Sequence, residues 1–219
     1  RGAGGGRGGL RERPSLGVMQ RRSLLALPLA AALPEARAGA QVEEPLADAV
    51  RTALAAAIGD GRPPKPQFFE LDARLAYLRW LGGTSEKLKR YKSEHATRVE
   101  FLETVWYESK RAGLETSLVL GLIQVESAFR KYAISPVGAR GYMQVMPFWS
   151  RLIGDGEPAR LFHMQTNLRF GCVILRHYLD RERGDLFMAL GRYNGSRGRA
   201  EYPNMVFGAR QRWDLKAPR

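Results

Sequence analysis

The pattern of apolar and polar positions along the chain predicts a succession of helices. Between residues 67 and 81, Leu71, Leu75 and Leu78 recur at intervals of three or four, which places them on one helix face. The glycine pair Gly82-Gly83 predicts the end of that helix. Similar patterns predict further helices over 42–58, 86–112, 116–130, 166–183 and 184–194, and Pro147 is suited to the first turn of another.

Strand patterns contribute little to this chain. No run of alternating residues predicts a long strand, although segment 134–145 allows a small hairpin. We therefore predict a mainly α protein with a single helical domain over residues 67–219. A helical and proline-rich segment, residues 41–66, precedes this domain.

One charged residue interrupts the most apolar of the predicted helices. Glu126 has Leu122 four residues before it and Phe129 three residues after it, so its carboxyl group lies on the face that should be buried. An unpaired charge there is costly. The carboxylate either pairs with Arg130 or Arg140, or keeps its proton because desolvation raises its pKa. A retained proton is what a general acid needs near neutral pH.

The residues after Glu126 favour the second interpretation. The segment that follows contains glycine and proline, which predict a loop, and it includes Ser135-Pro136. Three motifs then stand in order along the chain: Glu126-Ser127, the run Gly141-Tyr142-Met143-Gln144-Val145-Met146-Pro147, and Arg192-Tyr193-Asn194. Together they resemble the soluble lytic transglycosylases, whose domain shares the fold of goose-type lysozyme relatives. The resemblance covers roughly residues 110–205, and it implies a lysozyme-like fold with the hairpin beside an active-site cleft.

The resemblance also implies roles for individual residues. Glu126 matches the single catalytic acid of the family, and Ser135 matches a serine that lies near this acid. Tyr193 matches a tyrosine whose hydroxyl points towards the acid. The other matching residues are implied to brace the catalytic helix (Ser127), to line sugar subsites (Met143 and Gln144) and to accompany the tyrosine (Asn194). Arg192 departs from the family pattern, where alanine is usual, and adds a positive charge.

Each of these residues also has a purely structural interpretation. Met143 could fill the core, Gln144 could be a satisfied amide, and Tyr193 could be a packed aromatic. Ser135, which precedes a proline, could simply start a turn.

The implied reaction is cleavage of the β-1,4 bond between N-acetylmuramic acid and N-acetylglucosamine in peptidoglycan, with a 1,6-anhydromuramic product. The motifs offer only one carboxylate, which fits a reaction in which the substrate supplies its own nucleophile. No cofactor or metal is implied. A lysozyme-type hydrolase and an inactive peptidoglycan-binding protein remain the alternatives.

Composition narrows the classes of partner. The single cysteine, Cys172, excludes an internal disulfide framework, and the three histidines have no metal-ligand spacing. The formal net charge of +13 attracts polyanions. The basic residues form no Lys/Arg block and no basic–aromatic platform, so we predict an acidic cell-wall polymer rather than nucleic acid as the partner.

The N-terminal part has the layout of an export signal. Residues 1–18 are rich in glycine and arginine and are predicted to be an upstream or disordered extension. Residues 19–40 combine a basic start, a short apolar run and small residues before Ala40, which is typical of a signal peptide. The apolar run is too short for a stable membrane span. We therefore predict a periplasmic monomer that acts on peptidoglycan, with cell-envelope machinery as a further potential partner.

Overall fold

The computed structural model describes residue 2 and residues 41–59 and 66–215, and the two longer ranges belong to one compact unit. The predicted extension and signal peptide lie outside the described residues, as do most residues of the predicted linker. The described ranges are helical and contain no regular strand, so the mainly α prediction is confirmed. The α-helices are α1 (Asp48–Gly59), α2 (Leu71–Leu88), α3 (His95–Arg111), α4 (Thr116–Ser127), α5 (Pro147–Ile153), α6 (Met164–Arg181), α7 (Leu186–Asn194) and α8 (Glu201–Trp213), with a 3-10 turn η1 (Pro158–Phe162).

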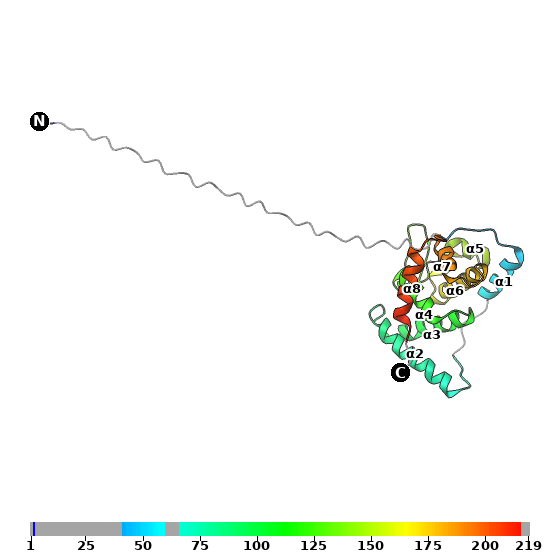
Figure 1. The fold of residues 1–219 in the computed structure, drawn as a ribbon, viewed down its shortest axis with the longest axis horizontal. Coiled ribbons are helices and arrows are strands. Elements are labelled where there is room, and N and C mark those ends of the chain that lie inside the picture. Colours follow the sequence, from blue (N-terminus) through cyan, green and yellow to red (C-terminus); the bar gives the residue numbers. More distant parts are fainter. Residues whose placement is uncertain (1, 3–40, 60–65, 216–219) are drawn as a thin grey trace. The chain divides into compact units, whose positions relative to one another are not determined.

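Helix α4 is the most deeply buried element, and α8 packs along it (Figure 1). Gly121 makes this close approach possible, because a Cβ atom there would lie 2.6 Å from the backbone nitrogen of Arg210. At the far end of α8, the Trp213 Nε1–H donates a hydrogen bond of 2.8 Å to Oε1 of Gln124. The two helices are therefore fixed against each other over most of their lengths.

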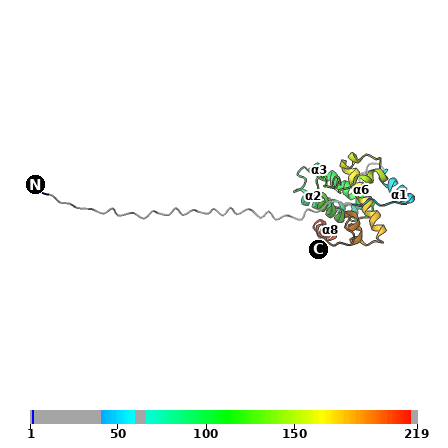
Figure 2. The same ribbon diagram turned by 90° about the horizontal axis from the view of Figure 1, so that it is seen from above.

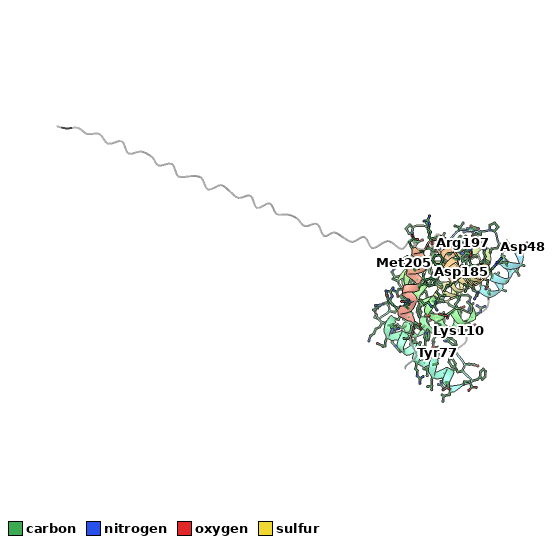
Figure 3. The ribbon with its side chains drawn as sticks, in the orientation of Figure 1. Asp48, Tyr77, Lys110, Asp185, Arg197 and Met205 are labelled. Carbon is green, nitrogen blue, oxygen red and sulfur yellow. The ribbon has the colours of Figure 1, made fainter. Side chains whose placement is uncertain are left out.

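The remaining helices surround this pair. Helix α3 packs against α2, α4 and α6, while α1 rests on α5 and α6 (Figures 1 and 2). Figure 3 places Tyr77 on α2 and Met205 on α8; the first is 7% exposed and the second 37%. Cys172 is buried within α6, as its apolar character predicts. None of the helices in the described ranges has the length and hydropathy that crossing a bilayer requires.

Helix α2 does not stop at Gly82-Gly83, so that prediction is wrong. The helix continues to Leu88 because Thr84, Ser85 and Leu88 are buried. Each glycine costs roughly 1 kcal/mol relative to alanine within a helix, and burial of Leu88 alone offsets a cost of that size.

Helix α3 begins later than predicted. The segment 86–112 contains the end of α2, a turn, and then α3 from His95. The Glu94 carboxylate caps α3 by accepting hydrogen bonds from the backbone N–H groups of Ala96 and Thr97. The sequence alone does not indicate this helix start, because the usual capping residues are serine, threonine, aspartate and asparagine, and glutamate is not among them.

Three other elements differ from prediction. Helix α1 starts at Asp48, so residues 41–47 are not helical. Segment 134–145 has isolated bridges between Ile134 and Arg140 and between Arg140 and Val145, but no regular hairpin. Helix α8 was not predicted at all, because Pro203 and Gly208 weaken its local helix propensity.

Candidate active site

Glu126 lies one residue before the end of α4, and its side chain is buried, with 4% of the residue exposed. The Tyr202 hydroxyl, which comes from α8, donates a short hydrogen bond to Oε1. Oε2 is buried without a hydrogen-bond partner among the described residues. Arg130, one of the two cations considered as a partner, instead donates from Nε to the Ser127 carbonyl at 3.0 Å. Within the described ranges, no ion pair neutralises the Glu126 carboxylate.

This environment favours the protonated form of Glu126. Burial raises the pKa of its carboxyl group from 4.5 to about 8, while the Tyr202 hydrogen bond acts in the opposite direction. The position near the carboxyl end of α4 also disfavours a negative charge, because the helix dipole is negative there. Glu126 is therefore protonated near neutral pH and can donate a proton.

The chain turns sharply after Glu126. Ala128 and Phe129 both adopt left-handed backbone conformations, with φ of 48° and 62°. Such conformations cost on the order of 1 kcal/mol each for residues with a Cβ atom. The Phe129 ring packs between Tyr91 and Trp213, with centroid distances of 4.7 and 5.1 Å, and this burial stabilises the turn. Backbone strain therefore sits directly beside the buried acid.

Ser127 and Asn167 connect α4 and α6 to the loop that carries the second motif. The Ser127 hydroxyl donates to the Tyr142 carbonyl at 2.7 Å and so joins α4 to this loop. The Asn167 amide donates to the carbonyl oxygens of Arg140 and Leu161, and its Oδ1 accepts from Met143 N–H at 2.8 Å.

Gly141 has φ of 75°, and a Cβ there would lie 2.4 Å from Asn167 Nδ2, so only glycine fits. Asn167 was not singled out from the sequence.

Ser135 is held within its own loop. Its hydroxyl oxygen accepts a hydrogen bond of 3.0 Å from the Ala139 N–H, and its backbone N–H donates to the Ala139 carbonyl. These two bonds stabilise the turn, and the role near the acid that the resemblance implies for Ser135 stays a prediction. The hydroxyl proton is not needed for either bond.

Met143 and Gln144 are more deeply buried than residues that line a sugar subsite should be. Met143 has no exposed surface, and its side chain packs on Gly171, so it fills the core as the structural interpretation held. Gln144 is 1% exposed, and its amide donates to the carbonyl groups of Ala133 and Gly141. Both side chains shape the loop from inside, and the subsite role that the resemblance implies for them stays a prediction.

The acid has a different tyrosine partner from the one that the third motif suggests. The Tyr193 hydroxyl donates to the Met143 carbonyl at 2.8 Å rather than to Glu126, although Tyr193 is within electrostatic reach of that acid. Tyr202 donates to the acid. Asn194, beside Tyr193, is 8% exposed. Neither α8 nor a role for Tyr202 was predicted from the sequence. A signal for this helix is present, because apolar residues recur at intervals of four, three and four residues at Tyr202, Val206, Ala209 and Trp213.

A cavity of about 1200 Å³ lies among α1, α3, α5 and α6. Lys131 and Tyr142, from the two ends of the loop after Glu126, contribute to its wall, but Glu126 does not line it. The described residues contain no group of three or more potential ligands that could hold a metal ion.

The sequence comparisons agree with this arrangement. Residues 103–215 match the family described as the Transglycosylase SLT domain. The match covers more than half of the chain and includes Glu126, the loop motif, Tyr193 and Tyr202. The chain belongs to this family.

Individual relatives share parts of this region. The chain is 39% identical over 84 residues to a membrane-bound lytic murein transglycosylase C of Actinobacillus pleuropneumoniae, which covers 35% of this chain and 23% of that protein. It is 48% identical over 93 residues to the protein of that name from Haemophilus ducreyi, covering 37% and 25%, and 33% identical over 104 residues to the transglycosylase of Enterobacteria phage PRD1, covering 48% and 38%.

A solved structure is also similar to part of the chain. This is the lytic transglycosylase Slt of Pseudomonas aeruginosa, in an inactive mutant, which is 25% identical with a TM-score of 0.40 and covers 64% of this chain and 27% of that one. The chain spans only 23% to 38% of the length of the curated relatives named above.

Proposed function

We propose that this protein is a peptidoglycan lytic transglycosylase with Glu126 as its acid and base. The observation that carries the proposal is the buried, unpaired carboxyl group of Glu126, whose pKa burial raises to about 8. Membership of the transglycosylase family supports the choice of substrate. Peptidoglycan is acidic, and residues 41–219 carry 28 basic against 20 acidic residues, so their formal net charge of +8 favours its binding.

The reaction proceeds through two proton transfers at one group. Protonated Glu126 donates its proton to the glycosidic oxygen between N-acetylmuramic acid and N-acetylglucosamine as the bond from muramic C1 breaks. The acetamido oxygen of the substrate stabilises the electron-poor C1. The Glu126 carboxylate then takes the proton of the muramic C6 hydroxyl, and O6 bonds to C1 to close the anhydro ring. Water is not consumed, and Glu126 ends protonated as it began.

The distribution of acidic residues supports a reaction with a single carboxylate. Among the acidic residues in the described ranges, only Glu108 and Glu126 are buried, and Glu108 is paired with Arg169. Asp155, Glu157 and Glu201, the other acidic residues near the motifs in sequence, are exposed. An enzyme with two catalytic carboxylates would need a second one close to Glu126.

The product distinguishes this reaction from hydrolysis. The full chain is incubated with purified peptidoglycan, and the released sugars are analysed by mass spectrometry beside a Glu126→Gln control. We expect fragments that end in the anhydro sugar, one water lighter than hydrolysed fragments. Reducing-end fragments instead would show that water is the acceptor, as in a lysozyme, and the absence of any product would support a binding protein.

Tyr202 has the role of tuning the acid. Its hydrogen bond favours the ionised form of Glu126, so Tyr202→Phe should raise the pKa of that acid and make it a weaker proton donor. We expect turnover to fall by about 10- to 100-fold, because hydrogen bonds to charged groups contribute roughly 1.5–3 kcal/mol. The alkaline limb of the pH–rate profile should move to higher pH.

Tyr193→Phe is the matched control for this experiment. It removes the hydroxyl that binds the Met143 carbonyl, so thermal stability should fall while the alkaline limb moves less than in Tyr202→Phe. The opposite result, with the limb moved only by Tyr193→Phe, would make Tyr193 the partner of the acid in solution.

The site of action is part of the same proposal. We expect export to the periplasm by the segment 19–40, and binding to glycan strands there as a monomer. Association with cell-envelope machinery is compatible with this location.

A further inference from the structure

The segment 41–47, here called the strap, is not helical, although the sequence predicts a helix from residue 42. Its first residue, Gln41, is only 4% exposed. Gln41 Oε1 accepts a hydrogen bond of 2.9 Å from the indole nitrogen of Trp149, which is itself 2% exposed. Leu46 packs against the hydrophobic core. The strap is therefore built into the domain rather than laid loosely over its surface.

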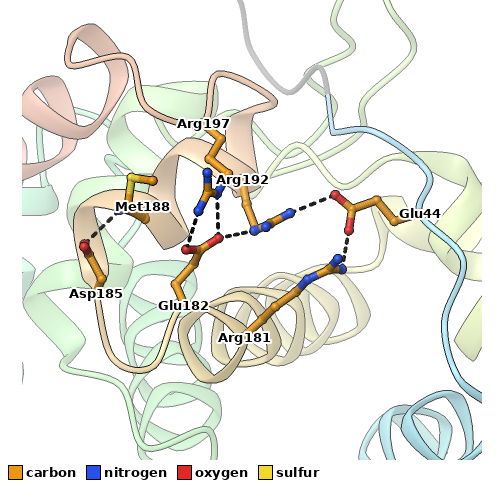
Figure 4. A network of polar contacts seen from close by, with 7 residues as sticks. All are labelled: Glu44, Arg181, Glu182, Asp185, Met188, Arg192 and Arg197. Atoms are coloured by element: carbon orange, nitrogen blue, oxygen red, sulfur yellow. Dashed lines mark hydrogen bonds and ion pairs between the residues drawn. The ribbon is translucent and has the colours of Figure 1, made fainter.

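An ion-pair network fixes the middle of the strap (Figure 4). Glu44 binds Arg181 at the end of α6 and Arg192 on α7, the latter at 2.9 Å. Arg192 also binds Glu182, which accepts two further hydrogen bonds from Arg197, of 2.8 and 3.0 Å. The exposed fractions of the side chains of Glu44, Arg192 and Glu182 are 29%, 19% and 9%. A partly buried network of this kind holds its members better than isolated surface pairs do.

Arg192 connects this network to the candidate active site. It directly precedes Tyr193 in the chain. Tyr193 in turn donates to the Met143 carbonyl in the loop that follows Glu126. An arginine at this position thus ties the third motif to Glu44 of the strap.

Gln41 and Glu44 thus anchor the strap at two points. Gln41 accepts the hydrogen bond from Trp149, and Glu44 binds Arg192, the residue before Tyr193.

We propose that Gln41 and Glu44 of the strap are positioning residues of the active site: Gln41 anchors the strap on Trp149, and Glu44 holds Arg192 beside Tyr193, so that the loop after Glu126 keeps its reactive geometry. This inference rests on the proposed function of Glu126. The strap touches no reacting atom. Through Arg192 it fixes Tyr193, whose hydroxyl binds the loop that follows Glu126, and small displacements near the acid are costly for catalysis.

The test compares Glu44→Gln with Glu43→Gln in the full chain. Glu43 is the matched control, because it is the neighbouring acid and makes only an exposed contact of 3.8 Å with Arg151. We expect Glu44→Gln to lower kcat for peptidoglycan cleavage by about 5- to 10-fold at unchanged KM, as loss of positioning affects the transition state. Glu43→Gln should retain the parental kcat. Equal rates for all three proteins at a temperature where all are folded would overturn the proposal.

A second measurement does not depend on activity. The indole N–H resonance of Trp149, assigned with Trp149→Phe, reports the hydrogen bond to Gln41. Gln41→Ala should shift this resonance and lower kcat, whereas Glu43→Gln should change neither. A shifted resonance with the parental kcat would make the strap merely structural. If the parental protein cleaves no peptidoglycan, the proposed function fails. An unshifted resonance in Gln41→Ala refutes the strap contact separately.

Discussion

Glu126→Gln is expected to lower peptidoglycan cleavage by about 10²–10⁴-fold or more, because the amide keeps the shape of the side chain but has no proton to transfer. The loss should be larger than for a group with a single role, since Glu126 is proposed to act first as acid and then as base. The measurement is the initial rate of release of soluble fragments from purified peptidoglycan. Glu157→Gln, which alters an exposed acid, should retain the parental rate.

The same substitution should change the pH dependence of stability. The folded chain holds the Glu126 proton up to about pH 8, whereas the unfolded chain loses it near pH 4.5. The stabilisation that the neutral acid provides is complete below pH 4.5 and is lost as pH rises towards 8. From pH 5 to pH 8, Glu126→Gln should therefore gain stability relative to the parent, on the order of 3 kcal/mol.

Thermal unfolding of both proteins at pH 5 and pH 8 measures this effect. A relative gain in Tm of about 6–12 °C for the glutamine variant is expected across this interval. An active parent whose stability relative to Glu126→Gln stays constant from pH 5 to pH 8 would mean that Glu126 is ionised in the folded protein, and its role as a proton donor would be wrong.

The second large effect concerns the ion pair between Glu108 on α3 and Arg169 on α6. Arg169 donates from Nε and Nη2 to Oε1 of Glu108, at 3.0 and 2.9 Å. The Arg169 side chain is 7% exposed and the Glu108 side chain 1%. Arg169→Met should destabilise the protein by about 3 kcal/mol, because the only ion pair that it leaves to the buried carboxylate within the described ranges is the longer contact to Arg111, of 3.6 Å. The Tm should fall by about 6–12 °C.

A double variant separates the charge effect from packing. Glu108→Leu combined with Arg169→Met removes both charges, so it should recover much of the lost stability. Arg160→Met, which breaks the exposed pair with Asp155, should change the Tm little. If the double variant is less stable than Arg169→Met alone, the loss comes from the aliphatic contacts of these side chains and not from an unpaired charge.

The candidate acid could be found from the sequence because its signal is local. A glutamate on the apolar face of a helix has few explanations, and the ordered motifs after it reduce them further. The loop motif could also be located, yet the orientation of its side chains could not. Met143 and Gln144 point into the protein because Asn167 holds the backbone of their loop by hydrogen bonds. Asn167 lies 23 residues after Gln144 in the chain, so a local pattern does not contain this contact.

Helix boundaries show the same division between local and distant causes. The start of α3 has a local cause, because the Glu94 carboxylate binds backbone N–H groups only two and three residues further along the chain. The continuation of α2 through Gly82-Gly83 depends on burial against distant residues, which helix propensity does not contain. The strap is a further case. Its contacts with Arg181, Arg192 and Trp149 determine its conformation, and they outweigh the local helical tendency of residues 41–47.

The sequence by itself determined the helical class, the family motifs and the identity of the buried acid, because periodicity and motif spacing are properties of short segments. Only the tertiary structure decided which tyrosine faces Glu126. Tyr193 and Tyr202 are 67 and 76 residues from the acid. The choice between them depends on how closely α8 packs on α4, which the absence of a side chain at Gly121 permits. Contacts between residues so far apart arise from packing, so the chain's local patterns could not predict them.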